Sequence, residues 1–235
     1  MMTLFRCGSI TIVSFLLFSF WQIQYNKLTR DEKKDGWQLL FDGKSTRGWH
    51  IFQKPETLNP QWKVENGTLT LTNKGGGDLV SDQEYENFEL SLEWKISKNG
   101  NSGIFFNVSE NAEFNAPWKT GPEMQILDDD GHPDGKIPTH TSGANYDFSI
   151  PLVKSVRAVG EWNHVRIVVN QGNVTYYLNG QVTAKFELWT PEWETAKRAT
   201  KFANMSEFGQ IKKGHIVLQD HGDPVWFRNI KIKPF

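Results

Sequence analysis

Apolar and polar residues alternate along much of the chain after Trp37. The clearest run is residues 88–96, where Phe, Leu, Leu, Trp and Ile alternate with Glu, Ser, Glu and Lys. Because successive strand side chains point to opposite faces, this run predicts a strand with one buried and one charged face. Similar runs predict further strands at 68–72, 103–108, 123–127, 164–169, 174–178, 183–188, 216–219 and 226–232.

Turn signals separate these strands. Asn-Gly pairs at Asn66, Asn99 and Asn179 favour the tight turns of β-hairpins. About ten strands at this spacing predict an all-β fold, a two-sheet antiparallel β-sandwich. One short helix is also expected, with Thr190 as its cap and Pro191 in its first turn. The face of this helix would carry Trp193, Ala196, Thr200 and Ala203.

The 235 residues indicate one domain, 35–235, after an N-terminal segment, 1–34. That segment carries Arg6 and an apolar run from Ile10 to Trp21, which is typical of a secretory signal peptide or an N-terminal anchor. We therefore expect an exported protein, periplasmic or extracellular, that meets a membrane only through this segment. Cys7 is the only cysteine, so a disulfide framework is excluded.

Formal net charge is −1 with both signs interspersed. A protein that neutralises nucleic-acid phosphates needs a basic surface, so nucleic acid is not an expected partner. The polar residues described next instead indicate a small carbohydrate as the expected ligand.

The richest polar segment is 121–136, GPEMQILDDDGHPDGK. If 123–127 is a strand, Glu123 and Gln125 share one face, and Met124 and Ile126 point into apolar packing. A solvated outer face would show the same alternation. The loop that follows adds further acids and imidazoles, namely Asp128, His132, Asp134 and His140.

Histidine, carboxylate and amide groups gathered at one loop suit acid–base catalysis near neutral pH. The same groups can hold a divalent cation, for which Asp128, His132 and His140 are the candidates, or they can simply organise the loop. In the C-terminal stretch, Gln219 and His221 share a strand face. Three other histidines, His50, His164 and His215, lie in or beside strand patterns without acidic company, so we expect structural roles for them.

Trp118 precedes the Glu123 strand in a loop. An exposed indole beside polar groups suits the C–H face of a sugar ring, although packing of the loop into the core explains it equally well.

Several stretches together resemble the 3-keto-disaccharide hydrolase family. They are GWQLLFDGKSTRGW, NSGIFF at 101–106, EMQILDDDGHPDGK, SEFGQIKKG and GHIVLQDHGDPVWFRNIKI, with a Tyr-Asp pair at 146–147, and they cover nearly the whole chain after residue 35. The resemblance implies a concanavalin A-like jelly roll and a substrate oxidised at C3. A ketone there acidifies the C2 proton, so that a base can start elimination of the C1 oxygen, and water is added afterwards.

The resemblance also implies roles for particular residues. The expected catalytic set is Glu123, Gln125, His132, His140 and His221, with Glu123 or a histidine as base and a histidine as acid. Lys136, amide donors or a divalent cation would stabilise the enolate oxygen. The expected substrate-binding set is Asn101, Trp118, Lys136, Tyr146, Gln219 and Arg228.

Two alternatives remain open at this point. An ordinary glycosidase needs a second carboxyl facing Glu123, for which Asp128 or Asp220 could serve, but strand alternation turns Asp220 away from His221. A non-catalytic lectin-like module would have the same fold.

Overall fold

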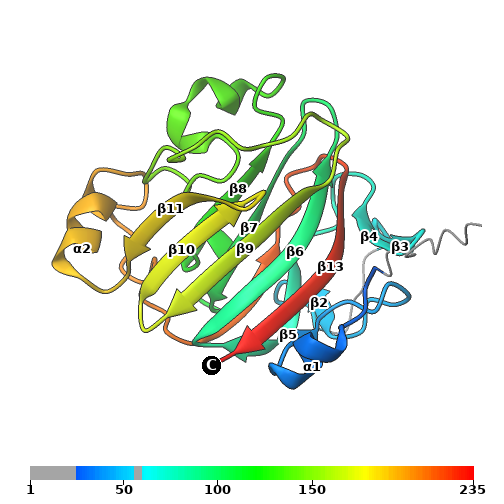
Figure 1. Cartoon of the computed structure of the whole chain (residues 1–235). Coiled ribbons are helices and arrows are strands. Elements are labelled where there is room, and N and C mark those ends of the chain that lie inside the picture. The colour runs from blue at the N-terminus through cyan, green and yellow to red at the C-terminus, as the bar shows by residue number, and fades with distance from the viewer. Residues whose placement is uncertain (1–24, 56–59) are drawn as a thin grey trace, which may run out of the picture.

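The computed structural model describes residues 25–55 and 60–235. The strands form two antiparallel sheets that pack face to face, as Figure 1 shows. The expected two-sheet antiparallel β-sandwich is confirmed. The apolar run of 10–21 lies outside the described residues, so the signal segment stays a prediction, and no described helix has the length and apolar character needed to cross a membrane.

The larger sheet has eight strands in the order β11-β10-β9-β6-β13-β4-β3, with β1 also paired to β13. Its strands are β1 (Gln38–Leu39), β3 (Trp62–Glu65), β4 (Thr68–Leu71), β6 (Phe88–Ile96), β9 (Asn163–Asn170), β10 (Asn173–Leu178), β11 (Gln181–Glu187) and β13 (Val225–Pro234).

The smaller sheet has five strands in the order β2-β5-β12-β7-β8. These are β2 (Trp49–Ile51), β5 (Leu79–Tyr85), β7 (Asn101–Val108), β8 (Glu123–Leu127) and β12 (Gly214–Leu218). Figure 1 shows β7 and β8 behind the larger sheet in this view.

The core lies between the two sheets. β6 buries every second residue, as its sequence alternation requires, and Trp94 is among the largest buried side chains. By contrast, every residue of β7 and β8 is buried. Their inner face joins the main core, whereas Phe105 and Val108 belong to a second apolar cluster with Phe52, Val80 and Val217. The outer face of the smaller sheet is therefore covered too.

The predicted helix exists as α2 (Pro191–Arg198), and the Thr190 hydroxyl accepts the Trp193 N–H at 3.1 Å. Trp193 is buried and stacks on Phe148 with ring centroids 4.4 Å apart. The expectation that Thr200 and Ala203 continue this helix face was wrong, because the helix ends at Arg198. The hydroxyl of Thr200 bonds to nearby backbone groups, the Lys197 carbonyl and the Phe202 N–H, and the chain turns there.

Residues 25–34, which the sequence placed in the N-terminal segment, pack on the domain. α1 (Arg30–Lys34) lies here, and Glu32 pairs with Lys231 at 2.6 Å. Asn26 is buried, and its backbone and side chain both exchange hydrogen bonds with Asn229 of β13.

Four strands, β1, β2, β3 and β5, were not predicted. The first three have four residues or fewer, too short to show a period, and β5 reads LVSDQEY, with a polar middle. Three short 3₁₀ helices complete the described elements, η1 (Pro117–Lys119), η2 (Pro133–Lys136) and η3 (Pro138–His140).

Candidate active site

A pocket of about 250 Å³ lies on the outer face of the smaller sheet. Its lining comes from β7, β8, the segment after β12 and the loops that cover this face. The lining residues are Asn101, Trp118, Glu123, Gln125, Tyr146, Lys201, Phe202, Gln219 and His221. The sequence therefore predicted seven of these nine side chains.

Strand alternation creates the floor of the pocket. On β8, Met124 and Ile126 enter the main core, so Glu123 and Gln125 point outward as predicted. Gly103 on the neighbouring β7 pairs with Gln125, and the Glu123 carboxylate lies directly over it. A Cβ at position 103 would overlap Glu123 Oε1, so a larger residue there would force the Glu123 carboxyl to shift.

The amide side chain of Gln125 holds the Glu123 carboxyl. With its amide oriented to satisfy both ends, Gln125 donates to Glu123 Oε1 at 3.0 Å and to the Ser102 carbonyl at 3.2 Å. Its oxygen then faces the Asn101 amide at 3.3 Å. Across the pocket, Gln219 Oε1 is buried and has no hydrogen-bond partner, which leaves an acceptor for a ligand hydroxyl.

Burial dominates the electrostatics of Glu123. The residue is 8% exposed, and removal from water raises the pKa of its carboxyl to about 8. The positive charge of Lys201 lowers this pKa in part, while the negative charges of Asp78 and Asp134 raise it. A buried carboxyl with a pKa near neutrality is typical of a general acid or base.

One wall of the pocket is Tyr146, and His140 lies behind it. The two rings stack with centroids 4.1 Å apart, and His140 Nε2 lies 3.3 Å from Asp147 Oδ1. Asp147 has a left-handed backbone (φ 68°), and its other oxygen accepts the Lys201 N–H at 3.0 Å. His140 is not a lining residue, so it supports the wall rather than facing the ligand space.

Sequence reasoning missed Lys201 and Phe202. Lys201 Nζ lies 4.2 Å from the centre of the Tyr146 ring, and Phe202 stacks on Phe208 at 3.9 Å. Both residues follow α2 by a few positions, and no local pattern separates a lysine there from an ordinary surface lysine. The backbone of Lys201 bonds to Asp147, which lies 54 positions away in the sequence, and this long-range contact holds Lys201 at the pocket.

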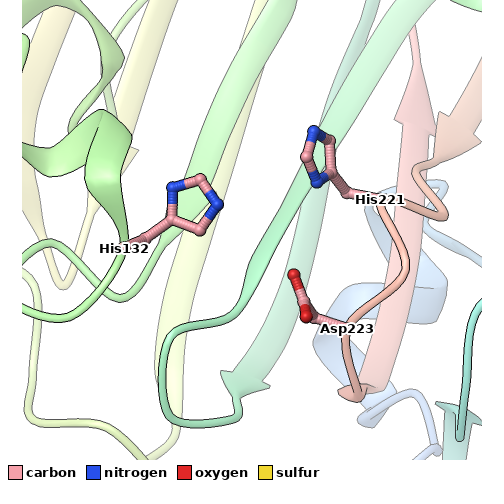
Figure 2. A group of neighbouring side chains, drawn as sticks. All are labelled: His132, His221 and Asp223. Carbon is pink, nitrogen blue, oxygen red and sulfur yellow. The ribbon is translucent and has the colours of Figure 1, made fainter.

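His221 lines the pocket and faces a second imidazole. The ring centroids of His132 and His221 lie 6.0 Å apart, nearly perpendicular. Figure 2 shows both rings and the Asp223 carboxylate around a common gap, His132 from the segment before η2 and the other two from the segment after β12. One possible ligand atom from each of the three residues lies within 4.8 Å of the other two.

Three predicted site residues lie elsewhere. Lys136 is exposed on η2 and does not line the pocket. Arg228 is in the larger sheet, where it pairs with Glu93 at 2.6 Å. Asp128 accepts the backbone N–H groups of Asn99 and Gly131 at 2.7 and 3.0 Å, so it organises a loop. Among the described residues, the expected metal set of Asp128, His132 and His140 does not form one cluster.

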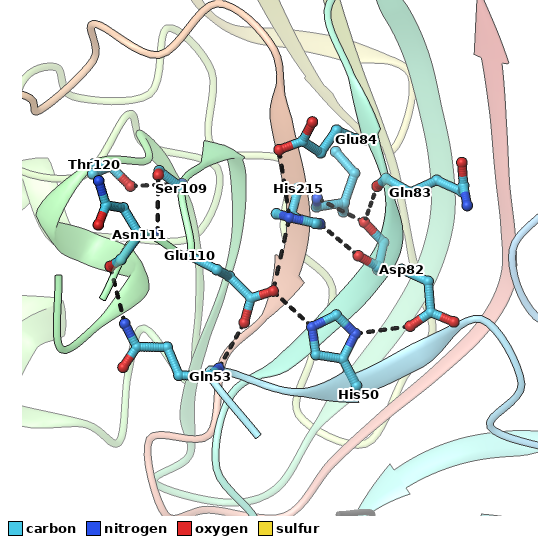
Figure 3. A network of polar contacts seen from close by, with 12 residues as sticks. His50, Gln53, Asp82, Gln83, Glu84, Ser109, Glu110, Asn111, Thr120 and His215 are labelled. Atoms are coloured by element: carbon cyan, nitrogen blue, oxygen red, sulfur yellow. Dashed lines mark hydrogen bonds and ion pairs between the residues drawn. The ribbon is translucent and has the colours of Figure 1, made fainter. Parts of the chain in front are cut away.

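The expectation that His50 and His215 lack acidic company was wrong. His50 lies 2.7 Å from both Asp82 and Glu110, and His215 lies 3.7 Å from Glu110, as Figure 3 shows. The acids come from strands and loops distant in sequence, so no local pattern could reveal them. His164 bonds to Ser91 at 3.0 Å and does not line the pocket, and its structural role stays a prediction.

Comparison with known proteins identifies the family. The model of the 3-keto-alpha-glucoside-1,2-lyase-like domain matches residues 36–233. The chain belongs to this family. A 3-keto-disaccharide hydrolase of Bacteroides thetaiotaomicron is 35% identical over 228 residues, which cover 85% of this chain and 78% of that protein. The expected enzyme class is thereby confirmed.

Two solved structures of similar sequence share the fold of this chain. A candidate glycosyl hydrolase of Parabacteroides distasonis superposes with a TM-score of 0.84 at 33% identity, over 90% of this chain and all of that one. A second from the same organism has a TM-score of 0.66 at 30% identity, over 85% of this chain and 99% of that one.

Proposed function

We propose that this family member cleaves the glycosidic bond of sugars that carry a ketone at C3, with Glu123 as the proton-transfer group. The observation that carries the proposal is a carboxyl that is buried in a sugar-sized pocket and whose pKa is raised to about 8. The name of the Bacteroides relative supports the substrate class.

The chemistry that follows is an elimination. The Glu123 carboxylate removes the proton on C2, which the neighbouring C3 ketone has made acidic. The electron pair forms a C1=C2 double bond while the bond from C1 to the leaving oxygen breaks, and that oxygen takes up a proton. Water then adds across the double bond, with its hydroxyl on C1 and a proton on C2, and releases a free 3-keto sugar.

Neighbouring side chains fit the other needs of this reaction. The amide of Asn101 and the ammonium of Lys201 can stabilise the developing enolate oxygen. Glu123 is the only carboxyl among the lining residues that the structure describes, so the protonated Glu123 and the His221 imidazole are the groups that can give a proton to the leaving oxygen. Trp118, 37% exposed, offers a stacking face at the rim.

An ordinary two-carboxylate glycosidase has less support. Its second acid would be Asp128 or Asp220, yet Asp220 bonds to the backbone N–H groups of Gly75 and Gly77 at 3.1 and 2.8 Å. Neither acid lines the pocket. A purely binding module has no need of a desolvated carboxyl, whose burial costs stability.

The test compares substrates and variants. Wild-type protein is incubated with 3-keto-trehalose and with trehalose, and released sugar is measured. We expect turnover of the ketone alone, and a loss of at least about 10³-fold in Glu123→Gln. Glu65→Gln, an exposed glutamate on β3, is the control and should keep full activity. Equal turnover of trehalose, or an active Glu123→Gln, would contradict the proposal.

A further inference from the structure

We propose that a cavity at the side of the sandwich binds a small uncharged aromatic ring that carries a hydroxyl group. The cavity has a volume of about 370 Å³ and lies between the edge strand β11, the helix α2 and the segment 145–149 beside β8. Figure 1 shows α2 next to the edge of the larger sheet that β11 forms. An apolar cavity of roughly 150 Å³ is enough for a benzene ring, so this cavity has room for one.

Aromatic side chains form the inner walls of the cavity. Phe148 and Trp193 stack with ring centroids 4.4 Å apart, and the Phe186 ring lies 5.6 Å from that of Trp193. Trp193 is buried, whereas Phe148 and Phe186 are only partly buried and line the cavity, so part of each phenylalanine ring stays open to it. Aromatic rings favour such neighbours at centroid distances of about 4.5 to 7 Å. The walls therefore favour a flat apolar ring.

One buried amide, that of Asn145, lies at the base of the cavity. Asn145 pairs with Met124 of β8, and opposite residues of an antiparallel pair direct their side chains to the same face. Met124 enters the core between the sheets, so the Asn145 side chain also points inward, where it lines the cavity. Asn145 is 2% exposed, and among the described residues its Oδ1 has no hydrogen-bond partner. A ligand hydroxyl that donates to Oδ1 would satisfy this buried acceptor.

The rest of the lining limits the chemical class of the ligand. Lys185, Glu187 and Glu192 are exposed at the rim and carry both signs of charge. A charged ligand would lose hydration against the phenylalanine rings without gaining a buried partner of opposite charge. Asn145 is the only buried polar side chain among the described lining residues, so it matches one hydroxyl. A sugar would leave several hydroxyls against aromatic walls, whereas phenol has one hydroxyl and one flat ring.

The cavity is separate from the candidate active site. Phe148 also stacks on Phe202, with centroids 5.9 Å apart, and Phe202 lines the active-site pocket. These two rings lie between the cavities, and no described residue lines both. Binding of a phenol in the side cavity therefore does not depend on the proposed function.

Binding is tested with phenol alone. The amide signals of ¹⁵N-labelled protein are followed by nuclear magnetic resonance during a titration with phenol. We expect the signals of Asn145, Phe186 and Ala196 to move with a dissociation constant of about 1 to 10 mM, the range open to a ligand of this size. The signals of Gln125 in the active-site pocket should stay in place. Glu123→Gln should bind phenol as wild type does, since Glu123 does not line the side cavity.

The first variant fills the cavity. Ala196 is exposed on α2 and lines the cavity, so Ala196→Trp should weaken phenol binding at least about tenfold. Ala199→Trp is the matched control, because it places the same side chain at the end of the same helix, at an exposed position outside the lining. It should bind phenol as wild type does.

The second variant, Asn145→Leu, removes the acceptor. Toluene has the shape of phenol but no donor, so the ratio of phenol affinity to toluene affinity isolates the hydrogen bond. We expect this ratio to fall about fivefold in Asn145→Leu, with circular dichroism confirming the fold.

Four results would overturn the proposal. The first two are signals of Asn145, Phe186 and Ala196 that stay in place in folded wild-type protein at about 20 mM phenol, or movement confined to the active-site pocket. The third is equal phenol affinity in Ala196→Trp and Ala199→Trp, and the fourth is an unchanged affinity ratio in Asn145→Leu. If methyl glucoside, and not phenol, moves the signals of the side cavity, the assigned ligand class is wrong.

Discussion

Glu123 and Gly103 form the smallest unit of the proposed active site. The carboxyl occupies the space over β7 that a side chain at position 103 would fill. The alternation of β8 made Glu123 and Gln125 predictable, because it depends only on neighbouring residues. Their surroundings were not predictable, because Lys201 reaches the pocket through a bond to Asp147 that spans the fold.

Gly103→Ala should displace the Glu123 carboxyl. The new methyl overlaps Oε1, so we expect turnover of a 3-keto-glycoside to fall by at least about tenfold. Gly160→Ala is the control, since its left-handed backbone (φ 85°) makes alanine strained but no atom lies near the new methyl. It should lose about 1 kcal/mol of stability and keep its activity. Full activity in Gly103→Ala, measured by steady-state kinetics, would show that the carboxyl position is unimportant.

Glu123 should also make the protein less stable as pH rises. Its pKa is about 8 when folded and near 4.5 when unfolded, so between these values the folded state binds more protons. Stability therefore falls as pH rises from about 4.5 to 8. Glu123→Gln removes this effect, and it should be more stable than wild type by roughly 2–4 kcal/mol at pH 8 and little changed at pH 4. Urea unfolding at both pH values checks this, and a variant less stable at pH 8 would contradict it.

At the scale of elements, loops cover the outer face of the smaller sheet and carry the pocket walls. The segment after β7 is attached by Glu110, which contacts His50 and accepts the Gln53 N–H at 2.6 Å. The same segment leads to η1 and Trp118. The strands beneath were predicted where they are long and alternating, but this attachment joins positions 60 residues apart and leaves no local pattern.

Glu110→Gln should weaken this attachment in a pH-dependent way. Burial lowers the pKa of His50, but the hydrogen bonds that its ring donates to the Asp82 and Glu110 carboxylates outweigh burial and raise the pKa above the ordinary value of 6.5. The stability from protonated His50 is therefore fully present below pH 6.5 and is lost as pH rises through the raised pKa. In Glu110→Gln we expect a lower pKa for His50 and about 1 kcal/mol less stability at pH 6 than wild type.

A histidine titration by nuclear magnetic resonance, with urea unfolding at pH 6 and 8, measures both effects. Glu113→Gln is the matched control, because Glu113 bonds to Asn111 and to no histidine. An unchanged pKa of His50 in Glu110→Gln would show that the contact in Figure 3 has little energetic weight.

At the scale of the whole molecule, the sandwich brings three distant segments to one face. β8 supplies the carboxyl, the segment after β12 supplies Gln219 and His221, and the turn after α2 supplies Lys201. The sheet class and most of this lining followed from strand periodicity and the family resemblance. The prediction for Arg228 was wrong because periodicity gives the face of a strand but not the sheet to which the strand belongs. The prediction for Lys136 was wrong because the sequence does not show which side of a loop faces the pocket.

The direct test of elimination is the fate of the hydrogen on C2. The protein is given a 3-keto-glycoside in heavy water, and the released 3-keto sugar is examined at early times by mass spectrometry, against an enzyme-free sample of that sugar to correct for spontaneous exchange. Removal of the C2 proton by Glu123, followed by hydration, predicts one deuterium at C2 in the product. Product that retains its original C2 hydrogen, as direct displacement at C1 would leave it, would contradict the proposed reaction.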